Sequence, residues 1–270
     1  MSAGRRPSLP LWLTAGALYL FLYAPLAVIF LYSFNDARHG GPWRGFTSHW
    51  YANLLDSEEK LAATRNTFVL AFASTAIATV VGTLLGFGLS RYRFPGKRVF
   101  SRLMYIPVVI PDIVMAVALL LLFSLLRERL GFAALELGMT TMILAHVTFQ
   151  IPFVAIVIRS RLVGLDPAIE EAAHDLGATS WQTFRHVTLP LMAPAVGAAA
   201  MLAFTLSLDD FVVSFFTSGP GSGTLPILIY ASVKRGITPD VNALSSLIVL
   251  VSVIGTLVAN RLQGHSTGDS

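Results

Sequence analysis

The chain contains no cysteine. This absence excludes a disulfide framework, a thiolate metal site and a cysteine nucleophile. Charged residues are also scarce, at 13% of the 270 positions, whereas an ordinary soluble domain carries about 25%. Together with a hydrophobic content of 54% and a mean hydropathy of +0.68, this scarcity indicates an integral membrane protein.

Three further classes of function lack their sequence signatures. A G-x-x-x-x-G-K-[ST] phosphate loop is missing, because Arg91 stands where the segment ending in Gly96 and Lys97 would need its first glycine. The Lys and Arg residues lie mostly between apolar segments and form no basic stripe. No nucleophile, base and orienting group can be assembled either. We therefore expect neither ATP hydrolysis, nor another enzymatic activity, nor nucleic-acid binding by this chain.

Six apolar segments reach the roughly 20 residues that a helix needs to cross a hydrocarbon core about 30 Å thick. They run over residues 11–32, 67–89, 103–126, 138–158, 189–216 and 241–259. The first is longer than a signal-peptide core and has no small-residue cleavage pattern after it, so we expect a retained helix. The sequence thus predicts an all-α polytopic membrane protein with six transmembrane helices.

The distribution of Lys and Arg predicts the orientation of these helices. The connection after the second segment holds five basic residues, namely Arg91, Arg93, Lys97, Arg98 and Arg102. Short loops rich in Lys and Arg stay in the cytoplasm. Both termini are then cytoplasmic, and the connections 35–66 and 217–240 face outside.

No internal repeat or low-complexity linker divides the chain, so we expect a single transmembrane domain over residues 1–270. In the second segment, Gly82 and Gly86 form a small-xxx-small pair that lets a neighbouring backbone approach closely. Ordinary helix packing is one interpretation of this pair, and a gating hinge is the other.

The connection between the fourth and fifth segments, about residues 160–188, carries strong helix signals. Asp166 suits an N-cap and Pro167 suits the first helical position. Glu170 and Glu171 come early, where the helix dipole favours anions, and Gly177 suits a left-handed C-terminal cap. These signals predict a short helix.

A second short helix is expected directly afterwards. Thr179 and Gln182 have capping-box spacing, and Arg185 and His186 fall in the last turn, before the chain re-enters the membrane. Two helices in so short a loop leave apolar side chains that need a covering surface, and these are Ile169, Leu176, Trp181 and Phe184. We interpret the loop as a docking element, in which Glu171 offers a carboxylate to a partner's arginine.

The spacing within this loop resembles a known motif. The residues that carry it are Glu171, Ala172, Ala173, Gly177, Val187, Leu189 and Pro190. Their spacing is similar to that of the EAA loop of importer-type ABC transporter permeases, which binds a cleft of the cytoplasmic ATPase. The resemblance implies that this loop couples the chain to ATP hydrolysis.

A wider resemblance covers nearly the whole chain and is to the putrescine/spermidine permease group, in particular its second-permease members. The similar stretches are residues 32–35, 110–112, 145–149, 206–211, 218–221, 224–226 and 238–244. The resemblance implies a type I importer fold in a bacterial inner membrane. It also implies a second homologous permease subunit, a cytoplasmic ATPase dimer that uses ATP and magnesium, and an external polyamine-binding protein. The chain itself would bind no cofactor and would contact membrane lipid.

Carboxylates inside predicted spans require an explanation, because a charge at the bilayer centre costs about 2.5–3.5 kcal/mol on insertion scales. Asp209 and Asp210 point about 100° apart on a helix, so at most one of them is expected to face a substrate path. A path for polyamines would combine carboxylates with aromatic faces such as Phe211 or Tyr230. A purely structural role between helices is the alternative for each Asp.

Three other features leave alternatives open. Asp112 follows Pro107 and Pro111, and either lines the path or caps a helix that restarts after Pro111. His146 has no partner at metal-ligand spacing, so a hydrogen-bonded packing role is expected and no metal site is predicted. The Gly- and Pro-rich residues 218–223 form either a plain turn or a gate that contacts the binding protein.

Rival functions remain open from the sequence alone. A permease for another small solute would share the docking loop, so the substrate prediction rests on the similar stretches and the Asp residues. An ion-coupled secondary carrier also uses intramembrane carboxylates, but it has no need of such a loop. The sequence does not say whether putrescine or spermidine is carried, which Asp faces the path, which helices move, or what share of substrate contacts the second permease supplies.

Overall fold

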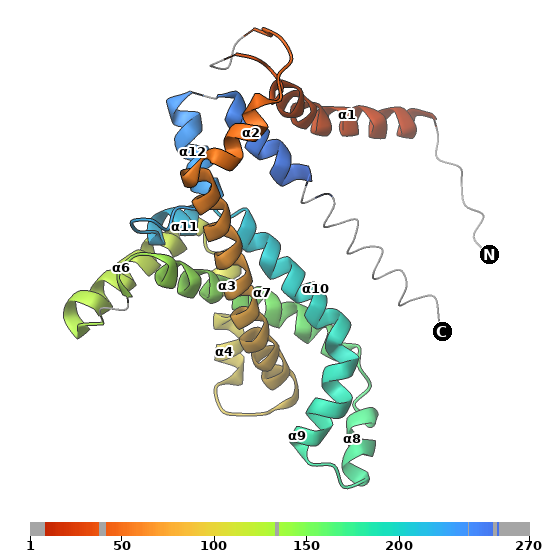
Figure 1. The fold of residues 1–270 in the computed structure, drawn as a ribbon. Coiled ribbons are helices and arrows are strands. Elements are labelled where there is room, and N and C mark those ends of the chain that lie inside the picture. The colour runs from red at the N-terminus through yellow and green to blue at the C-terminus, as the bar shows by residue number, and fades with distance from the viewer. Residues whose placement is uncertain (1–8, 38–41, 133–134, 237, 251–252, 254–270) are drawn as a thin grey trace. The chain divides into compact units, whose positions relative to one another are not determined.

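The computed structural model describes residues 9–37, 42–132, 135–236, 238–250 and 253 (Figure 1). Apart from one isolated bridge between Asn35 and Phe46, these residues form helices and the connections between them. The all-α class is therefore confirmed. The chain divides into two compact units, one drawn from Met1–Leu61 and Ile229–Ser270 and the other from Ala62–Leu228. The prediction of a single domain stays a prediction.

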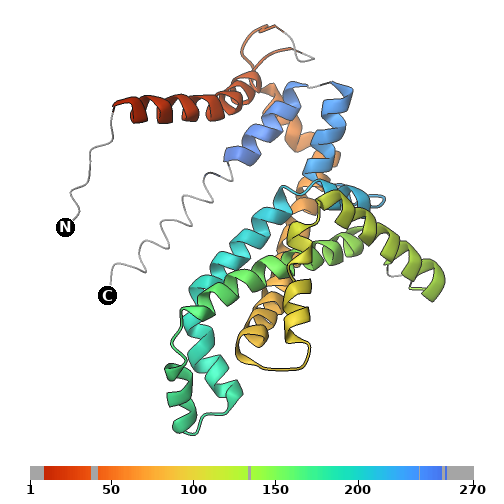
Figure 2. The same cartoon turned by 180° about the vertical axis from the view of Figure 1, so that it is seen from behind.

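The first unit contains α1 (Leu9–Tyr32), α2 (His49–Asp56) and most of α12 (Leu225–Arg235), followed by a helix over Pro239–Leu250. The side chains of α1 are exposed almost throughout, as expected for a helix that contacts lipid or another subunit. Asp240, in the first turn of the last helix, forms a salt bridge with Lys60. Figure 2 shows these helices from behind.

A polar turn follows α1 and contains residues 33–35 of the first stretch that resembles the putrescine/spermidine permeases. Ser33 and Asn35 are both buried. The Ser33 hydroxyl lies 2.7 Å from the Tyr51 hydroxyl, and Oδ1 of Asn35 accepts a hydrogen bond from the Arg44 amide at 2.9 Å. Trp50 donates its indole N–H to the carbonyl of Asn35 at 2.9 Å. These contacts fix α2 against the end of α1.

The second unit is built around α3 (Glu58–Arg91), α7 (Met139–Val163) and α10 (Leu189–Leu208). A Cβ at Gly82 would lie 2.6 Å from Cβ of Val154, and one at Gly86 would lie 2.9 Å from the carbonyl oxygen of Ala155. The glycine pair therefore lets α7 approach the backbone of α3, as the small-xxx-small spacing predicts.

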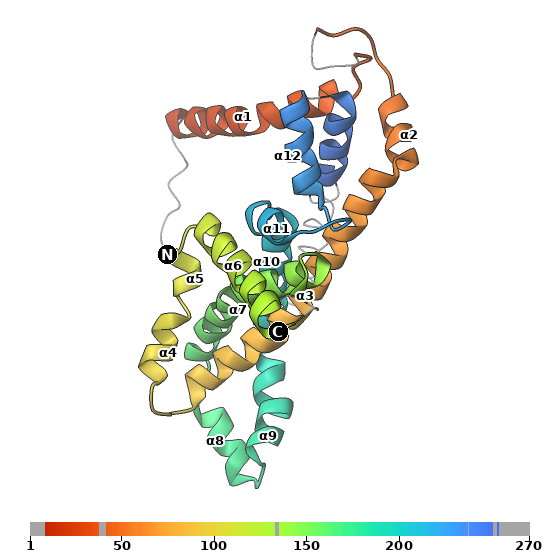
Figure 3. The same ribbon diagram turned by 90° about the vertical axis from the view of Figure 1, so that its left-hand side faces the viewer.

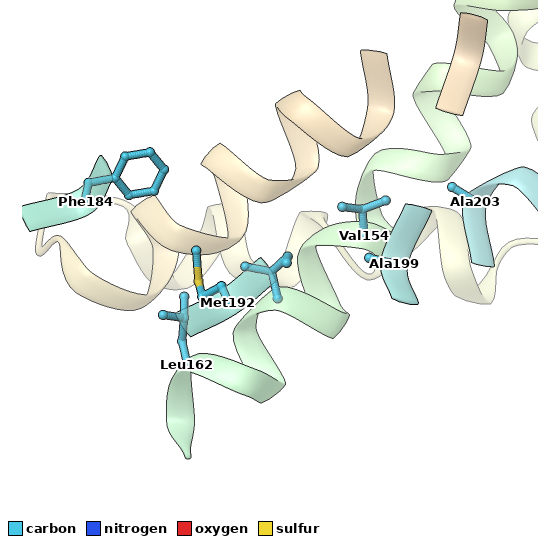
Figure 4. Packing of buried hydrophobic residues seen from close by; sticks show 7 residues of the cluster. Val154, Leu162, Phe184, Met192, Ala199 and Ala203 are labelled. Atoms are coloured by element: carbon cyan, nitrogen blue, oxygen red, sulfur yellow. The ribbon is translucent and has the colours of Figure 1, made fainter. Parts of the chain in front are cut away.

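A buried apolar cluster joins α7 to α10 (Figure 4). It consists of Val154, Ile158, Leu162, Phe184, Met192, Ala199 and Ala203. The two alanines let α10 approach α7 closely, and the larger side chains fill the space beside them. The ring of Phe87 extends the cluster to α3, with its centroid 4.7 Å from that of Phe184.

The third predicted span is broken rather than straight. The region contains α4 (Lys97–Leu103), α5 (Ile106–Val109) and α6 (Asp112–Leu130). The segment Lys97–Val109 and α6 meet at a bend of 110° (Figure 3). Ile110 and Pro111 both adopt extended ψ angles, of 136° and 135°. A residue before proline is disfavoured in the helical region, so Pro111 explains where the helix stops.

The fifth predicted span also differs from a simple helix. A π-helical turn, η2 (Phe184–Thr188), precedes α10, and a break over residues 209–211 separates α10 from α11 (Val212–Thr217). Pro190 follows the π turn at the start of α10, where a missing N–H is tolerated, and Pro194 lies inside α10. α11 packs on α6 and α7 through Val213, Ala116 and Ala145.

Four helices in the described residues are long and apolar enough to cross a membrane, and the bent pair makes a fifth. The sixth predicted span, residues 241–259, is described over residues 241–250, in the helix Pro239–Leu250, and at residue 253; its other residues lie outside the described part of the chain. The helix that contains the second predicted span, α3, begins at Glu58, nine positions before that span. Hydropathy marks the apolar part of a helix and does not mark where the helix ends.

Candidate coupling loop and buried polar network

The loop after α7 contains the short helix that its local signals predict. α8 covers Ala168–Asp175. Oδ1 of Asp166 accepts a hydrogen bond from the Ala168 amide at 3.0 Å, which is the contact expected of a capping carboxylate. Gly177 ends the helix in the left-handed region with φ +87°, where a side chain would be strained.

The second short helix is present at its start but not at its end. Thr179 and Gln182 form the predicted capping box, with Thr179 N donating to Oε1 of Gln182 at 2.8 Å. However, α9 (Ser180–Thr183) runs through η2 into α10, giving one helical segment over Ser180–Leu208. The prediction of a separate helix ending at Arg185 and His186 was wrong, because the π turn lets the chain continue past Pro190.

Glu170 connects α8 to the long apolar helices through two polar contacts. Its Oε2 lies 3.0 Å from Nε of Arg91, the last residue of α3, and its Oε1 accepts a hydrogen bond from the Thr188 hydroxyl at 3.0 Å. The side chains of Glu170 and Arg91 are only 19% and 20% exposed. Partial burial strengthens this pair relative to a surface salt bridge. Glu170 therefore connects α8 to the last residue of α3 and to Thr188, directly before α10.

Glu171, its neighbour, points elsewhere and is exposed. The other motif residues follow the helix: Ala172 is exposed, Ala173 is half-buried, Leu189 is half-buried and Pro190 is exposed at the start of α10. Apolar side chains beside them face outward in this chain, with Leu176 90% and Trp181 64% exposed. Figure 1 shows α8 and α9 side by side, beyond the ends of α7 and α10.

A network of buried polar side chains joins α3, α7 and α10. Nε2 of Gln150 donates to the carbonyl of Ala203 at 2.9 Å and to the Ser74 hydroxyl at 3.3 Å. The Ser74 and Ser207 hydroxyls are themselves 3.3 Å apart. All three side chains are essentially inaccessible to solvent, so these hydrogen bonds fix the rotation of the three helices about their axes.

His146 continues this network to the break between α10 and α11. Its Nδ1 lies 2.8 Å from the Ser207 hydroxyl, its Nε2 lies 3.0 Å from the Ser214 hydroxyl, and Oδ2 of Asp210 approaches Nε2 at 3.3 Å. His146 is therefore a buried, hydrogen-bonded packing residue, as the sequence predicts. The carboxylate partner was missed because it comes from the break between α10 and α11, 64 positions away in the sequence.

The two adjacent carboxylates lie in different environments. Asp210 accepts hydrogen bonds from the amides of Val213 and Ser214, at 3.3 and 2.7 Å, and its side chain is 11% exposed. Asp210 therefore satisfies amides in the first turn of α11 and also approaches His146. Asp209 is exposed at the end of α10. The break itself had a signal in the sequence, because Asp favours helix N-caps over helix interiors.

The remaining candidate path residues are more scattered. Asp112 is exposed at the first position of α6, and its side chain does not form the cap there. Among the described residues, no recorded hydrogen bond or ion pair joins it to Asp209 or Asp210. Phe211 is half-buried, with its ring centroid 5.4 Å from that of Phe215. Tyr230 belongs to the other unit, where the ammonium of Lys234 lies 4.8 Å from the centre of its ring.

The loop at residues 218–224 is firmly attached to the second unit. Nδ2 of Asn66 donates to the carbonyls of Gly221 and Gly223, and the Leu225 amide donates to the Thr67 hydroxyl at 2.8 Å. A Cβ at Gly219 would lie 1.8 Å from the carbonyl oxygen of Leu137. A cavity of about 540 Å³ beside the loop is lined by Arg65, Asn66, Val69, Met139, Pro220, Gly221 and Ser222.

Comparison with known sequences identifies similar proteins. Residues 78–267 match the family described as "Binding-protein-dependent transport system inner membrane component". The spermidine/putrescine transport system permease protein PotC of Escherichia coli (strain K12) is 41% identical over 257 residues, covering 94% of this chain and 95% of that protein. The putrescine transport system permease protein PotI of the same strain is 43% identical over 239 residues, covering 88% and 85%.

Solved structures share the fold at lower identity. A chain of a bacterial ABC transporter involved in the import of the acidic polysaccharide alginate superposes with a TM-score of 0.75 at 21% identity, covering 95% of this chain and 96% of that one. A chain of the MetNI methionine ABC transporter superposes with a TM-score of 0.60 at 22% identity, covering 80% and 97%. These similarities establish the importer-permease fold.

Proposed function

Because the chain belongs to the family of binding-protein-dependent transport system inner membrane components, we propose that it is the permease subunit of an ATP-driven importer of polyamines, namely putrescine, spermidine or both. The observation that carries the substrate is the identity of 41–43% to polyamine permeases over most of the chain. The protein is a multi-pass membrane protein, and the coupling loop is its connection to the energy source.

The partner at the coupling loop is a cytoplasmic ATPase dimer, which would bind the ATP and magnesium. Three exposed side chains on or beside α8 support this assignment: Glu171, Leu176 and Trp181. An apolar surface of this kind with a carboxylate at its edge suits a protein cleft that contains an arginine. The chain itself needs no cofactor for this role.

The mechanism follows from the attachment of this loop. When the ATPase dimer closes, it moves α8, and the contacts of Glu170 with Arg91 and Thr188 pass the movement to α3 and α10. α10 leads directly to the break at Asp209 and Asp210. ATP-driven movement at the loop would therefore tilt α10 and move the carboxylates at its end together with it.

Of these two carboxylates, we assign Asp209 to the substrate path. Asp210 is already engaged by His146 and by the amides of α11, whereas Asp209 is exposed. A protonated amine of a polyamine would bind the exposed carboxylate, with Phe211 close by in sequence to contact the carbon chain. Asp112 and Tyr230 are further proposed contacts, and a second homologous permease subunit would complete the path.

The proposed orientation places both termini and the coupling loop in the cytoplasm, in a bacterial inner membrane. An external binding protein would then deliver the polyamine to the opposite side, where the loop at residues 218–224 offers a rigid surface. The attachment of this loop by Asn66 and Thr67 supports a docking role over a mobile gate.

Uptake of labelled putrescine and spermidine tests the substrate assignment. The complete complex is reconstituted in vesicles, and ATP-dependent uptake is compared between wild type, Asp209→Asn and Asp210→Asn at matched protein levels. We expect Asp209→Asn to lower uptake while the complex stays assembled and thermally stable. No uptake of either polyamine by the wild-type complex would overturn the substrate assignment and leave the family membership intact.

Charge reversal tests the ATPase contact separately. We expect Glu171→Arg to abolish uptake and to weaken co-purification of the ATPase, with the chain still inserted in the membrane. Glu128→Arg, an equal charge reversal at an exposed residue near the end of α6, serves as the control and should change neither. Unchanged uptake in Glu171→Arg would contradict the proposed coupling role.

A further inference from the structure

A second cavity lies away from the residues discussed so far. It is a groove of about 180 Å³ between the C-terminal part of α3 and the segment that leads into α4, lined by Leu84, Leu85, Gly88, Leu89, Phe94 and Phe100. Every lining side chain is apolar. Leu89 is only 2% exposed and packs with Met104 and Ala155. Phe94 and Phe100 are 42% and 53% exposed.

The same segment carries an unusual concentration of positive charge. Arg93 precedes Phe94, and Arg98 and Arg102 lie four residues apart on one face of α4, while Val99 and Leu103 occupy another. All three arginines are exposed. Within the part of the chain that the structure describes, no recorded salt bridge pairs any of them with a carboxylate. The sequence offers no Asp or Glu at all between residues 61 and 111.

We propose that this groove binds a phospholipid with an anionic headgroup. An acyl chain would lie on Leu84, Leu85 and Gly88 between the two phenylalanines, and the phosphate would contact Arg93, which directly precedes Phe94. One molecule that is apolar at one end and anionic at the other satisfies both halves of this surface. A short helix with basic and apolar faces is the arrangement that lies in the membrane interface, and basic pockets beside membrane helices bind anionic headgroups.

The position of the groove connects the lipid to the transport cycle. Arg91 lies three residues after Gly88 on α3, and it forms the salt bridge to Glu170 of the coupling helix. A bound phospholipid would therefore contact the same end of α3 that receives the movement of α8. The site does not depend on which substrate is carried.

Photo-crosslinking tests the proposal on the intact complex. The complex is placed in phosphatidylcholine nanodiscs with a trace of either phosphatidylglycerol or phosphatidylcholine that carries a diazirine on one acyl chain, and the labelled peptides are mapped. We expect the phosphatidylglycerol probe to label residues 84–103 and the phosphatidylcholine probe to label them severalfold less. Replacing Arg93 by Gln should lower the phosphatidylglycerol labelling by about fivefold. Arg98 and Arg102 lie on the face of α4 opposite Phe100, so replacing them together by Gln is the control and should lower the labelling less.

Matched glycine variants separate a groove from general contact with lipid. A Cβ at Gly88 would meet no atom within 4 Å, so Gly88→Leu fills the groove without disturbing the helix; Gly197 on α10 is equally open and provides the control. Gly88→Leu should lower the labelling of residues 84–103, and Gly197→Leu should not. Both variants are first checked for assembly and unchanged Tm.

Three outcomes would overturn the proposal. The first is equal labelling by both probes, which would mean ordinary contact with the bilayer. The second is displacement of the phosphatidylglycerol probe by inorganic phosphate alone, which would mean a site for a small anion. The third is absence of label on residues 84–103 in the wild-type complex, which would mean that another subunit covers the groove.

Discussion

Nε2 of His146 lies 3.3 Å from Oδ2 of Asp210, in a position where the imidazole has no exposed surface. The other ring nitrogen contacts Ser207, in the last turn of α10, so one side chain of α7 spans the break from α10 to α11. Specific hydrogen bonds from His146 therefore bridge the break between α10 and α11. Asp209 lies exposed within this break.

We expect His146→Leu to destabilise the protein. The substitution removes one hydrogen-bond partner from the Ser207 and Ser214 hydroxyls and from the Asp210 carboxylate. The cost is about 0.5–1.5 kcal/mol for each neutral hydrogen bond and about 1.5–3 kcal/mol for the one to the charged group. The thermal unfolding midpoint of the purified protein in detergent measures this effect. Thr148→Val is the control on the same helix, because the Thr148 hydroxyl is exposed and donates only to the carbonyl of Leu144. Equal Tm values for the two variants would contradict the role of His146.

We expect Glu170→Ala to loosen the coupling helix without unfolding the protein. The change removes an acceptor that Arg91 and Thr188 both use, worth about 1.5–3 kcal/mol for a hydrogen bond to a charged group. Hydrogen exchange of the α8 amides should then become faster by tenfold or more. Glu171→Ala, one position along, is the control and should leave exchange in the isolated chain unchanged. Transport should fall in both variants for different reasons.

The glycines of α3 should respond differently to the same substitution. Gly82→Ala and Gly86→Ala place a Cβ within 3 Å of α7, so each should lower stability by about 1–3 kcal/mol. Gly88→Ala meets open space and gains helix propensity of about 1 kcal/mol, so its Tm should stay equal or rise. A gating-hinge role of the pair would instead predict altered transport with an unchanged Tm.

The salt bridge between Lys60 and Asp240 should make stability depend on pH. Burial raises the pKa of Asp240, but the hydrogen bond and positive charge of Lys60, with bonds from Thr238 and the Val241 amide, bring the pKa below its usual value of 3.8. Its contribution is therefore fully present above pH 3.8 and is lost as the pH falls through the lower pKa of the folded state. Unfolding measured from pH 7 to pH 3 should show a loss in the wild type that Asp240→Asn reduces. Parallel curves for the two proteins would refute this assignment.

The coupling loop was largely predictable because its signals are local. Asp166, Thr179, Gln182 and Gly177 each act on backbone groups within a few residues, and each does so in the structure. The helix stop before Pro111 was likewise encoded locally, because a residue before proline is disfavoured in the helical region. The continuation of α9 through η2 into α10 was not predicted from local signals; Phe184, the first residue of η2, packs into the cluster between α7 and α10.

The polar network was not predictable because its partners are far apart in sequence. Ser74, His146 and Ser207 look like scattered polar residues in apolar segments until the helices pack. Glu170 was expected only as a charge favoured at a helix start, and its link to Arg91 spans 79 positions. The difference between the exposed Asp209 and the hydrogen-bonded Asp210 likewise depends on His146, a residue more than sixty positions away.

The hydrogen bonds among Ser74, Gln150 and Ser207 constrain the motion available to a transport cycle. Lipid offers no hydrophobic penalty against sliding one helix past another, yet sliding or twisting here would leave these polar groups unpaired in an apolar medium. We therefore expect α3, α7 and α10 to tilt together as a rigid body. The change of angle must then occur elsewhere, and the two-proline joint between α5 and α6 has no such bonds to break among the residues described.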